Sequence, residues 1–258
     1  MTRWSLYITA YRTIVIKEIL RFMRIWVQTV LPSAITTTLY FVIFGKLIGE
    51  RIGEMGGFSY IEFIVPGLIL MSVIQNSYAN VVSSFFGTKL QHYIEELLIA
   101  PVPNWVVLAG YVSGGVARGT LVGFVVTLIS MFFTDLSIHS FAITLLVFVL
   151  TSILFALGGF INAVYAKTFD DVSIIPTFVL IPLTYLGGIF YSIELLPDFW
   201  QGVSLGNPVL YMVKAFRFGI LGVSDINILV AVSMILVFIA VLAVFSLSLL
   251  HRGVGIKK

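Results

Sequence analysis

The stretch YIEFIVPGLILMSVIQNSYANVVSSFF, residues 60–86, decides the fold of this chain. It is a continuous apolar run, and a helix needs about 20 such residues to cross the hydrocarbon core of a bilayer. A strand of a membrane barrel would instead alternate apolar and polar residues over roughly ten positions. The stretch therefore predicts a membrane-spanning helix.

Further apolar runs of the same kind lie on both sides of this stretch, at residues 26–48, 104–133, 140–165, 174–191 and 226–250. Of the 258 residues, 59% are hydrophobic and only 10% are charged, with a mean hydropathy of +1.08. A water-soluble domain carries about 25% charged residues. The composition excludes an ordinary soluble domain and predicts an all-α, polytopic membrane protein with six transmembrane helices.

The positions of Lys and Arg predict the orientation of these spans, because cytoplasmic loops are enriched in both residues. With both termini in the cytoplasm, ten of the 15 cations lie inside: Arg3, Arg12, Lys17, Arg21, Arg24, Lys89, Lys167, Arg252, Lys257 and Lys258. Only Lys46, Arg51, Lys214 and Arg217 lie outside, and Arg118 lies within a span. The net charge of +3 is too small to indicate nucleic-acid binding.

Residues 1–25 predict an amphipathic helix in the inner membrane interface. Apolar residues recur there at helical spacing, and Lys17, Arg21 and Arg24 form an adjoining basic stripe that suits anionic lipid headgroups. Five charged residues interrupt the apolar run, so it does not read as a cleavable signal peptide. Two roles stay open, membrane anchoring and docking of a partner. Residues 26–258 then form the six-helix domain.

Two connections are longer than a simple turn requires. Residues 87–103, GTKLQHYIEELLIAPVP, predict a short amphipathic helix at 89–99 that ends at Pro101 and Pro103, since proline lacks an amide donor. Residues 192–225 are more apolar than a water-exposed loop, and Gly206-Asn207-Pro208 interrupts the helical pattern there. They predict two short helices that re-enter the membrane from outside, where broken backbone must be covered by protein.

Polar residues inside the spans are the candidate functional residues. Arg118 is the most costly, at about 2.5–3.5 kcal/mol near a helix centre; it either faces the helix bundle or snorkels to the inner interface. Ser72, Asn76 and Asn80 share one stripe of the second span, with Gln75 beside it. The stripe indicates either hydrogen bonds between helices or the wall of a polar path. Glycines at 110, 114, 115, 119 and 123 predict close helix approach around Arg118.

Several classes of chemistry are missing from the sequence. The chain has no Cys and three His without metal-ligand spacing, and it contains neither a phosphate loop nor a nucleophile elbow. We therefore expect no catalytic residues, no metal and no cofactor bound by this chain. Membrane lipid is an expected partner, and nucleic acid is not.

The ordered set of segments resembles the type-2 ATP-binding-cassette transporter permeases, a family that includes drug, polysaccharide and nodulation-factor export permeases. The resemblance covers the whole chain. It rests on KEILRFMR at 17–24, GTKLQHYIEELLIAPVP at 87–103, PLTYLGGIFYSIELLP at 182–197 and LGNPVLYMVKAFR at 205–217. Family members often carry a more basic loop and Thr-Pro-Val where this chain has Ala100-Pro101-Val102.

The resemblance implies a multi-pass permease of the bacterial inner membrane. It would work as a homodimer with two copies of a separate ATPase subunit that binds ATP. Residues 1–25 would be the connecting helix, and residues 192–225 the outer re-entrant segment. The coupling helix would contact the ATPase through Lys89, Gln91, His92, Glu95 and Glu96. Substrate would pass along the dimer interface, and the low charge of that path favours an amphipathic, lipid-linked or drug-like molecule.

Two other classes of protein fit parts of the pattern. An ion-coupled secondary transporter would move its substrate without an ATPase, although such proteins often show repeated halves and acidic residues at the midplane. A non-transporting membrane assembly protein would tolerate substitution of Arg118 and of the polar stripe.

Overall fold

The structure is a computed structural model that describes residues 3–223 and 226–255, apart from the side chains of Lys46 and Leu98. The predicted inner cations Lys257 and Lys258 lie outside the described residues, as do the last two residues of the 192–225 segment.

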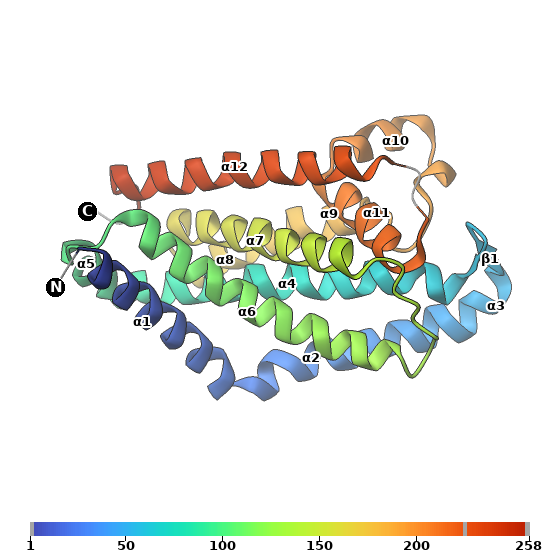
Figure 1. Cartoon of the computed structure of the whole chain (residues 1–258), viewed down its shortest axis with the longest axis horizontal. Coiled ribbons are helices and arrows are strands. Elements are labelled where there is room, and N and C mark those ends of the chain that lie inside the picture. Colours follow the sequence, from blue (N-terminus) through green and yellow to red (C-terminus); the bar gives the residue numbers. More distant parts are fainter. Residues whose placement is uncertain (1–2, 224–225, 256–258) are drawn as a thin grey trace.

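Helices make up almost all of the described chain, and the long ones run side by side along the length of the molecule (Figure 1). In order, the elements are α1 (Arg3–Arg24), α2 (Trp26–Tyr40), η1 (Phe41–Ile48), α3 (Gly49–Ile52), β1 (Glu54–Met55), β2 (Phe58–Ser59), α4 (Tyr60–Leu90), α5 (Tyr93–Ile99), α6 (Asn104–Ser130), α7 (Phe141–Tyr165), α8 (Phe169–Ile175), η2 (Pro176–Leu180), α9 (Ile181–Tyr185), η3 (Ile193–Leu195), α10 (Asp198–Leu205), α11 (Pro208–Leu221) and α12 (Ile228–Arg252). The all-α prediction is confirmed, since β1 and β2 form only a short hairpin with two residues in each strand.

Five helices of the described chain are long and apolar enough to cross a membrane: Trp26–Ile52, α4, α6, α7 and α12. The predicted count of six is not confirmed. The stretch predicted to span at 174–191 is α8, η2 and α9, which together reach only Tyr185. Pro176 and Pro182 remove amide donors from it, the middle part has π-helical hydrogen bonding, and the chain turns at Gly188 with φ of +70°.

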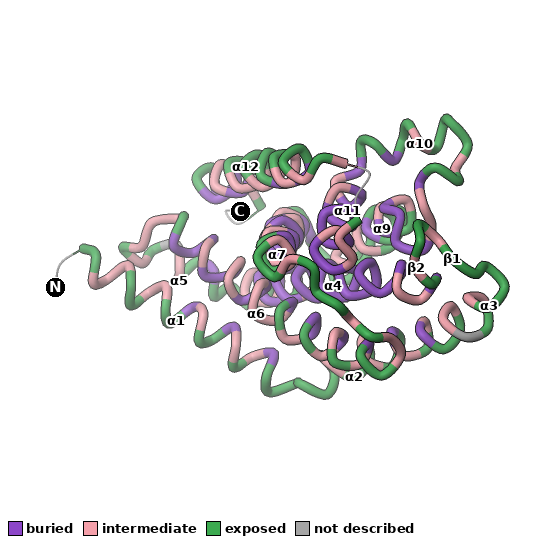
Figure 2. The backbone as a smooth tube through the Cα atoms, turned by 45° about the vertical axis from the view of Figure 1, so that its right-hand side comes forward, coloured by how far each residue is buried: buried purple, intermediate pink, exposed green. Residues whose placement is uncertain are grey.

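Helix α4 is the centre of the bundle, and most of its length is buried (Figure 2). It packs mainly against α7 and α6, whereas α12 covers α7 and keeps much of its own surface exposed. The side chains exposed on α12 are apolar, such as Leu229, Val237 and Val244. This arrangement suits a lipid environment, because outward-facing apolar helices need no polar cover there.

Glycines let the central helices approach closely, as the sequence predicted. A Cβ on Gly114 would lie 2.5 Å from the Cβ of Glu18 in α1, and one on Gly115 would lie 2.7 Å from Val81 in α4. Gly159 of α7 faces main-chain atoms of α4. The glycines of α6 therefore serve two neighbours, with Gly110 and Gly114 against α1 and Gly115 and Gly119 against α4.

The two ends of the molecule differ. Both chain ends and α5 lie at one end, and we call this the α5 end (Figure 1). The opposite end carries α3, the β1–β2 hairpin, α10 and α11. The helix pair predicted at 192–225 is present, since α10 and α11 are separated at Gly206-Asn207, where the Asn207 side chain accepts from the amide of Val209. Helix α11 is largely buried and α10 largely exposed.

Candidate functional site: a polar column and an exposed helix at the α5 end

The polar stripe of α4 is buried between helices. Ser72, Asn76, Asn80 and Ser84 recur every fourth residue, and each is less than 9% exposed. We call these four residues the polar column. Asn76 Nδ2 donates to Ser33 Oγ of α2 at 3.0 Å and to the carbonyl oxygen of Ser72. Of the two functions predicted for the stripe, the structure therefore places these side chains in hydrogen bonds within and between helices.

Arg118 of α6 faces the helix bundle. Its Nε donates to Asn76 Oδ1 at 3.3 Å, so Asn76 connects α2, α4 and α6. Because hydrocarbon offers no alternative partner, a half-buried guanidinium within a span is held where a neighbouring helix supplies an oxygen. Of the two orientations left open by the sequence, the structure shows the bundle-facing one.

The end of the polar column nearest α5 holds a charged group that sequence reasoning missed. Glu18 of α1 is 0% exposed, and its carboxylate accepts a 2.5 Å hydrogen bond from Ser84 Oγ. Lys17 Nζ and Arg21 Nε lie 3.3 and 3.4 Å from its oxygens. Arg21 Nη2 also donates to Asn80 Oδ1 at 2.8 Å. Glu18 thus attaches the amphipathic helix to α4 by hydrogen bonds, and its ion pairs with Lys17 and Arg21 lie within α1 itself.

The signal for Glu18 was present in the sequence. It is the one acidic residue among the cations of residues 1–25 and lies between Lys17 and Arg21. Its spacing of four residues from both Ile14 and Phe22, which are buried, puts it on the packed face of α1. An acidic residue on that face predicts a polar partner on another helix.

Gln75 is the exposed exception beside the column. It lines a cavity of about 160 Å³ between α2 and α4, with Ser33, Thr36, Thr37 and Ser72 in its walls. It also lines a cavity of about 480 Å³ between α4 and the α8–α9 helix, whose walls include Ser83, Ser173, Thr177 and Thr184. The polar groups named in both cavities are uncharged hydroxyls and amides. Of the predicted path residues, Ser72 and Gln75 therefore line cavities, and Gln75 lines both of them.

The predicted helix at 89–99 begins later than expected. Helix α4 continues through Leu90, and α5 begins at Tyr93. Between them His92 takes a left-handed conformation, with φ of +61°, that reverses the chain in two residues. The periodicity of Leu90, Tyr93 and Ile94 could not show this break, because a left-handed residue interrupts a helix without changing its apolar spacing.

We expect His92→Gly to keep α5 in place and His92→Val to displace it. The left-handed region costs an L-residue about 1–2 kcal/mol, glycine nothing, and a β-branched residue the most. The measurement is the rate of trypsin cleavage after Lys89, which should rise for His92→Val alone. Equal cleavage of the two variants would contradict a backbone requirement at this position.

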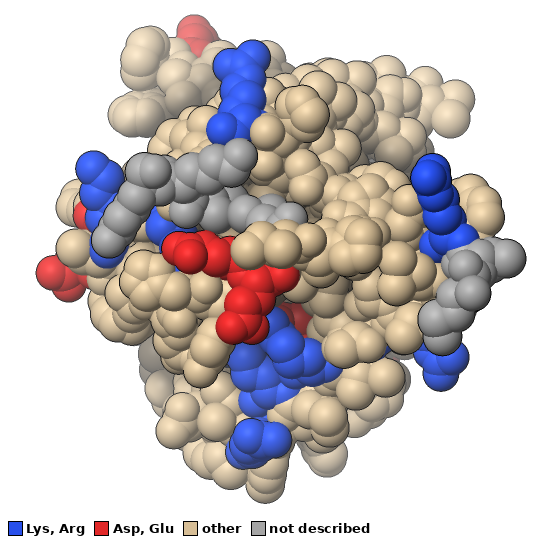
Figure 3. Space-filling view, turned by 90° about the vertical axis from the view of Figure 1, so that its left-hand side faces the viewer, with Lys and Arg blue, Asp and Glu red and all other residues tan. Residues whose placement is uncertain are grey.

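Charged side chains gather at the α5 end of the molecule. Figure 3 looks onto this end and shows acidic side chains near its centre, with basic ones beside them. Helix α5 contributes Glu95 and Glu96, and these side chains are exposed together with Gln91 and His92. His92 Nδ1 lies 3.4 Å from Glu95 Oε1. Lys89 differs from these four, because its ammonium points toward the end of α7.

Beside α5, the start of α8 is held by a second acidic group. Asp171 accepts from the amides of Lys167 and Thr168 at 2.8 and 3.0 Å, and Thr168 Oγ1 accepts from the Asp171 amide. These main-chain hydrogen bonds hold the pKa of Asp171 below its ordinary value. The carboxylate is therefore charged at neutral pH, and its contribution to the start of α8 is lost only as pH falls through that depressed pKa.

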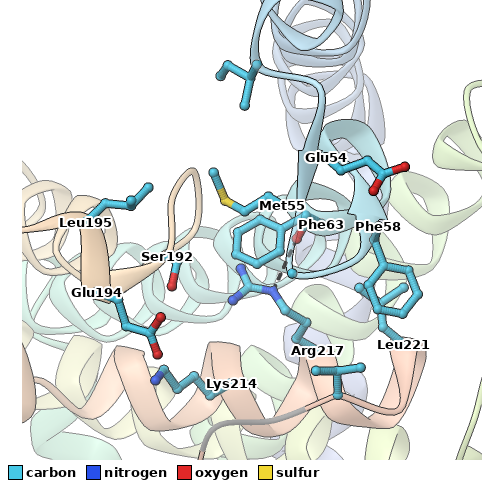
Figure 4. Close-up of a pocket in the computed structure, with 13 residues that line it drawn as sticks. Glu54, Met55, Phe58, Phe63, Ser192, Glu194, Leu195, Lys214, Arg217 and Leu221 are labelled. Carbon is cyan, nitrogen blue, oxygen red and sulfur yellow. Dashed lines mark hydrogen bonds between the residues drawn. The ribbon is translucent and has the colours of Figure 1, made fainter.

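The opposite end contains a cavity of about 430 Å³ between the hairpin, α11 and the 192–195 segment. Arg217 donates from Nε to the carbonyl oxygen of Phe63 at 3.2 Å and from Nη2 to that of Gly188 at 2.8 Å. Its guanidinium also lies over the Phe63 ring, 3.7 Å from the centroid. Figure 4 shows the side chains of Lys214 and Glu194 pointing toward one another among the residues that line the cavity. Arg217 therefore joins α4, α11 and the turn after α9.

Metal chemistry finds no support in the part of the chain that the structure describes. No group of three or more His, Asp or Glu residues lies close enough there to hold a metal ion. The fold and the polar column instead define a class of protein, a polytopic helical membrane protein with a buried polar core and an exposed helix at one end.

Comparison with known proteins identifies the family. Residues 9–221 match the family described as ABC-2 type transporter. The chain is 59% identical to the "Inner membrane transport permease YadH" of Escherichia coli K12 over 98% of both chains. It is also 21% identical to "Nodulation protein J" of Rhizobium leguminosarum bv. viciae over 87% of both chains. The chain therefore belongs to the ABC-2 type transporter family.

Family membership decides among the classes that the sequence left open. The protein is the permease subunit of an ATP-binding-cassette exporter and not an enzyme, and ATP hydrolysis takes place on a separate subunit. The resemblance drawn from the four sequence segments is confirmed. An ion-coupled transporter and an assembly protein are both set aside.

Proposed function

We propose that this chain forms a homodimer in the bacterial inner membrane and works with two copies of an ATP-binding-cassette ATPase. The proposal rests on one observation above all, which is that a short exposed helix, α5, follows directly from the end of α4, the most buried helix. The printed name of the relative from E. coli, an inner membrane transport permease, supports the same membrane.

In this proposal α5 is the coupling helix, and the exposed side chains of its Glu95 and Glu96, with Gln91 and His92 just before it, contact the ATPase. Helix α5 is attached firmly to the rest of the chain. Ile94 is 2% exposed and packs into the core, and the left-handed turn at His92 leaves little freedom between α4 and α5. A displacement imposed on α5 would therefore reach α4 without being absorbed by a flexible linker.

The α5 end would face the cytoplasm. The supporting observations are that Lys89 and Lys167 line a cavity together with Glu95 of α5, and that α1, which carries five cations, begins at this end, where both chain ends also lie (Figure 1). Helix α1 would lie in the inner interface. Trp4, Ile8 and Leu20 are exposed there, as expected for side chains that face lipid.

The transported molecule would pass along the face on which Gln75 is exposed. Both cavities beside Gln75 are flanked by α2 or by the α8–α9 helix, and their polar groups are hydroxyls and amides. Such groups bind a hydrogen-bonding but weakly charged molecule, since a strongly charged one would lack counter-ions. We therefore favour an amphipathic or lipid-linked substrate over a multiply charged one. The sixth crossing would be made by the α8–α9 helix and the residues after it.

Replacing Glu95 and Glu96 together by Lys tests the ATPase contact. We expect the double variant to lose copurification with the coexpressed ATPase, because reversal of two charges in an interface converts attraction into repulsion. The folded permease should be unaffected, since both side chains are exposed. Copurification in mild detergent and the thermal unfolding midpoint measure the two effects.

The matched control reverses Glu50 and Glu54, two exposed acidic residues at the opposite end. This variant should copurify like the unmodified chain. Equal copurification of both double variants, with both chains folded, would remove α5 as the contact.

A further inference from the structure

Lys89 is the last cation of α4, and its ammonium is placed on the end of a different helix. Its Nζ donates to the carbonyl oxygens of Val164 and Ala166 at 2.6 Å each, and to that of Ala163 at 3.4 Å. An ammonium group has three N–H donors, so these three acceptors account for all of them. Helix α7 ends at Tyr165, so Lys89 occupies the position where a helix leaves its last carbonyls without partners.

The contact has a clear physical advantage. The C-terminal end of a helix carries partial negative charge, and a cation there is stabilised by both charge and hydrogen bonding. The C-terminal turn closes the same site from the other side, because a Cβ on Gly255 would overlap the carbonyl oxygen of Val164. The ends of α4 and α7 and the turn that follows α12 therefore meet at one point.

The place where these three segments meet lies next to α5. Lys89 and Glu95 line the same cavity of about 520 Å³, together with Tyr165 and Lys167. Three residues separate Lys89 from α5, and they include the left-handed turn at His92. A displacement of α5 that moves Lys89 therefore has one of two results. Either the end of α7 moves with Lys89, or Lys89 leaves α7 and its three hydrogen bonds are lost.

We propose that Lys89 is a positioning residue that couples the movement of α5 to α7, so that one ATP-driven displacement moves two helices of the bundle. The proposal rests on the proposed role of α5 as the coupling helix. It places Lys89 between the ATPase contact and the helix bundle and not in the contact itself, because its ammonium already donates to carbonyl oxygens at the end of α7. Without Lys89, α5 and α4 would still move, but the last turn of α7, which lies beyond the close contact of Gly159 with α4, would not follow.

The test uses the permease–ATPase complex in phospholipid vesicles. The chain has no Cys, so a single Tyr165→Cys at the exposed end of α7 can carry a spin label without background. The variants are Lys89→Met, which keeps an unbranched side chain without donors, and Lys89→Arg, which restores donors. The control is Lys167→Met, which removes a neighbouring cation that lines the same cavity. The spectrum is recorded without nucleotide and with ATP plus vanadate.

We expect the label to respond to ATP plus vanadate in the unmodified, Lys89→Arg and Lys167→Met complexes. The response should be lost in Lys89→Met, while the ATPase still copurifies. A full response in Lys89→Met would overturn the proposal, even if its melting temperature fell, because Lys89 would then be structural only. Loss of copurification in Lys89→Met would also overturn it, since Lys89 would be an ATPase contact. Failure of the proposed role of α5 is detected separately, by unchanged copurification of the Glu95 and Glu96 double variant.

Discussion

Gly159→Ala should destabilise the folded chain by about 2–3 kcal/mol, an effect at the upper end of overpacking. The added Cβ would lie 2.5 Å from the carbonyl oxygen of Tyr78, 3.2 Å from its carbonyl carbon and 3.3 Å from its Cα. All three are main-chain atoms of α4, so no side-chain rotation can relieve the contact. Helices α4 and α7 would have to separate along a main contact of the bundle.

The matched control is the preceding residue. A Cβ on Gly158 would meet only the ring of Tyr78, at 3.9 Å, which is ordinary van der Waals contact. Gly158→Ala should be neutral, or more stable by up to about 1 kcal/mol, because alanine is the better helix former. Thermal unfolding of the two variants in the same detergent measures the difference. Similar midpoints would show that α4 and α7 are less tightly packed than the structure describes.

Glu18→Ala should destabilise the attachment of α1 by about 3 kcal/mol, the range found when one partner of a buried charge network is removed. Ser84 and Asn80 would lose their acceptor, and Arg21 would keep its charge without the carboxylate beside it. The upper end of that range, about 5 kcal/mol, is not expected. The Lys17 and Arg21 side chains are 49% and 29% exposed and keep some solvation.

Limited trypsin digestion measures the release of α1, since Arg12 and Lys17 are cleavage sites on it. Cleavage at these sites should accelerate in Glu18→Ala. The cleavage rate of Glu18→Gln should lie between the rates of Glu18→Ala and the unmodified chain, because the amide oxygen can still accept from Ser84 but lacks the charge. Glu50→Ala, an exposed acidic residue at the opposite end, should stay within about 0.5 kcal/mol of the unmodified chain. Cleavage of α1 at unchanged rates in Glu18→Ala would contradict the role of this carboxylate.

Much of the fold could be predicted from the sequence because membrane helices are encoded locally. An apolar run of sufficient length, ended by polar residues or proline, predicts a helix without knowledge of its neighbours. All five of the long helices, the amphipathic α1 and the α10–α11 pair were predicted in this way, with boundaries that differ by a few residues. The span predicted at 174–191 is not confirmed, because Pro182 and the turn at Gly188 shorten the helix there.

The candidate site was predicted only in part. The polar column and the glycines of α6 were visible in the sequence because their residues recur every four positions. This spacing alone could not distinguish hydrogen bonds between helices from the wall of a polar path. Glu18 was missed because its neighbours in sequence are cations, which made α1 read as a basic stripe. Lys89 was expected among the ATPase contacts of the coupling helix, whereas α4 extends past it and its ammonium binds the end of α7.

By itself the sequence determined that the chain is a helical membrane protein, where most of its helices lie, and which family its segments resemble. The tertiary structure alone decided which polar groups are paired, with Glu18 on Ser84, Arg118 on Asn76 and Lys89 on the end of α7. The physical reason is the distance along the chain. Helix formation depends on hydrogen bonds and apolar area within a few turns, whereas these partners lie 42 to 75 residues apart and meet only when the helices pack.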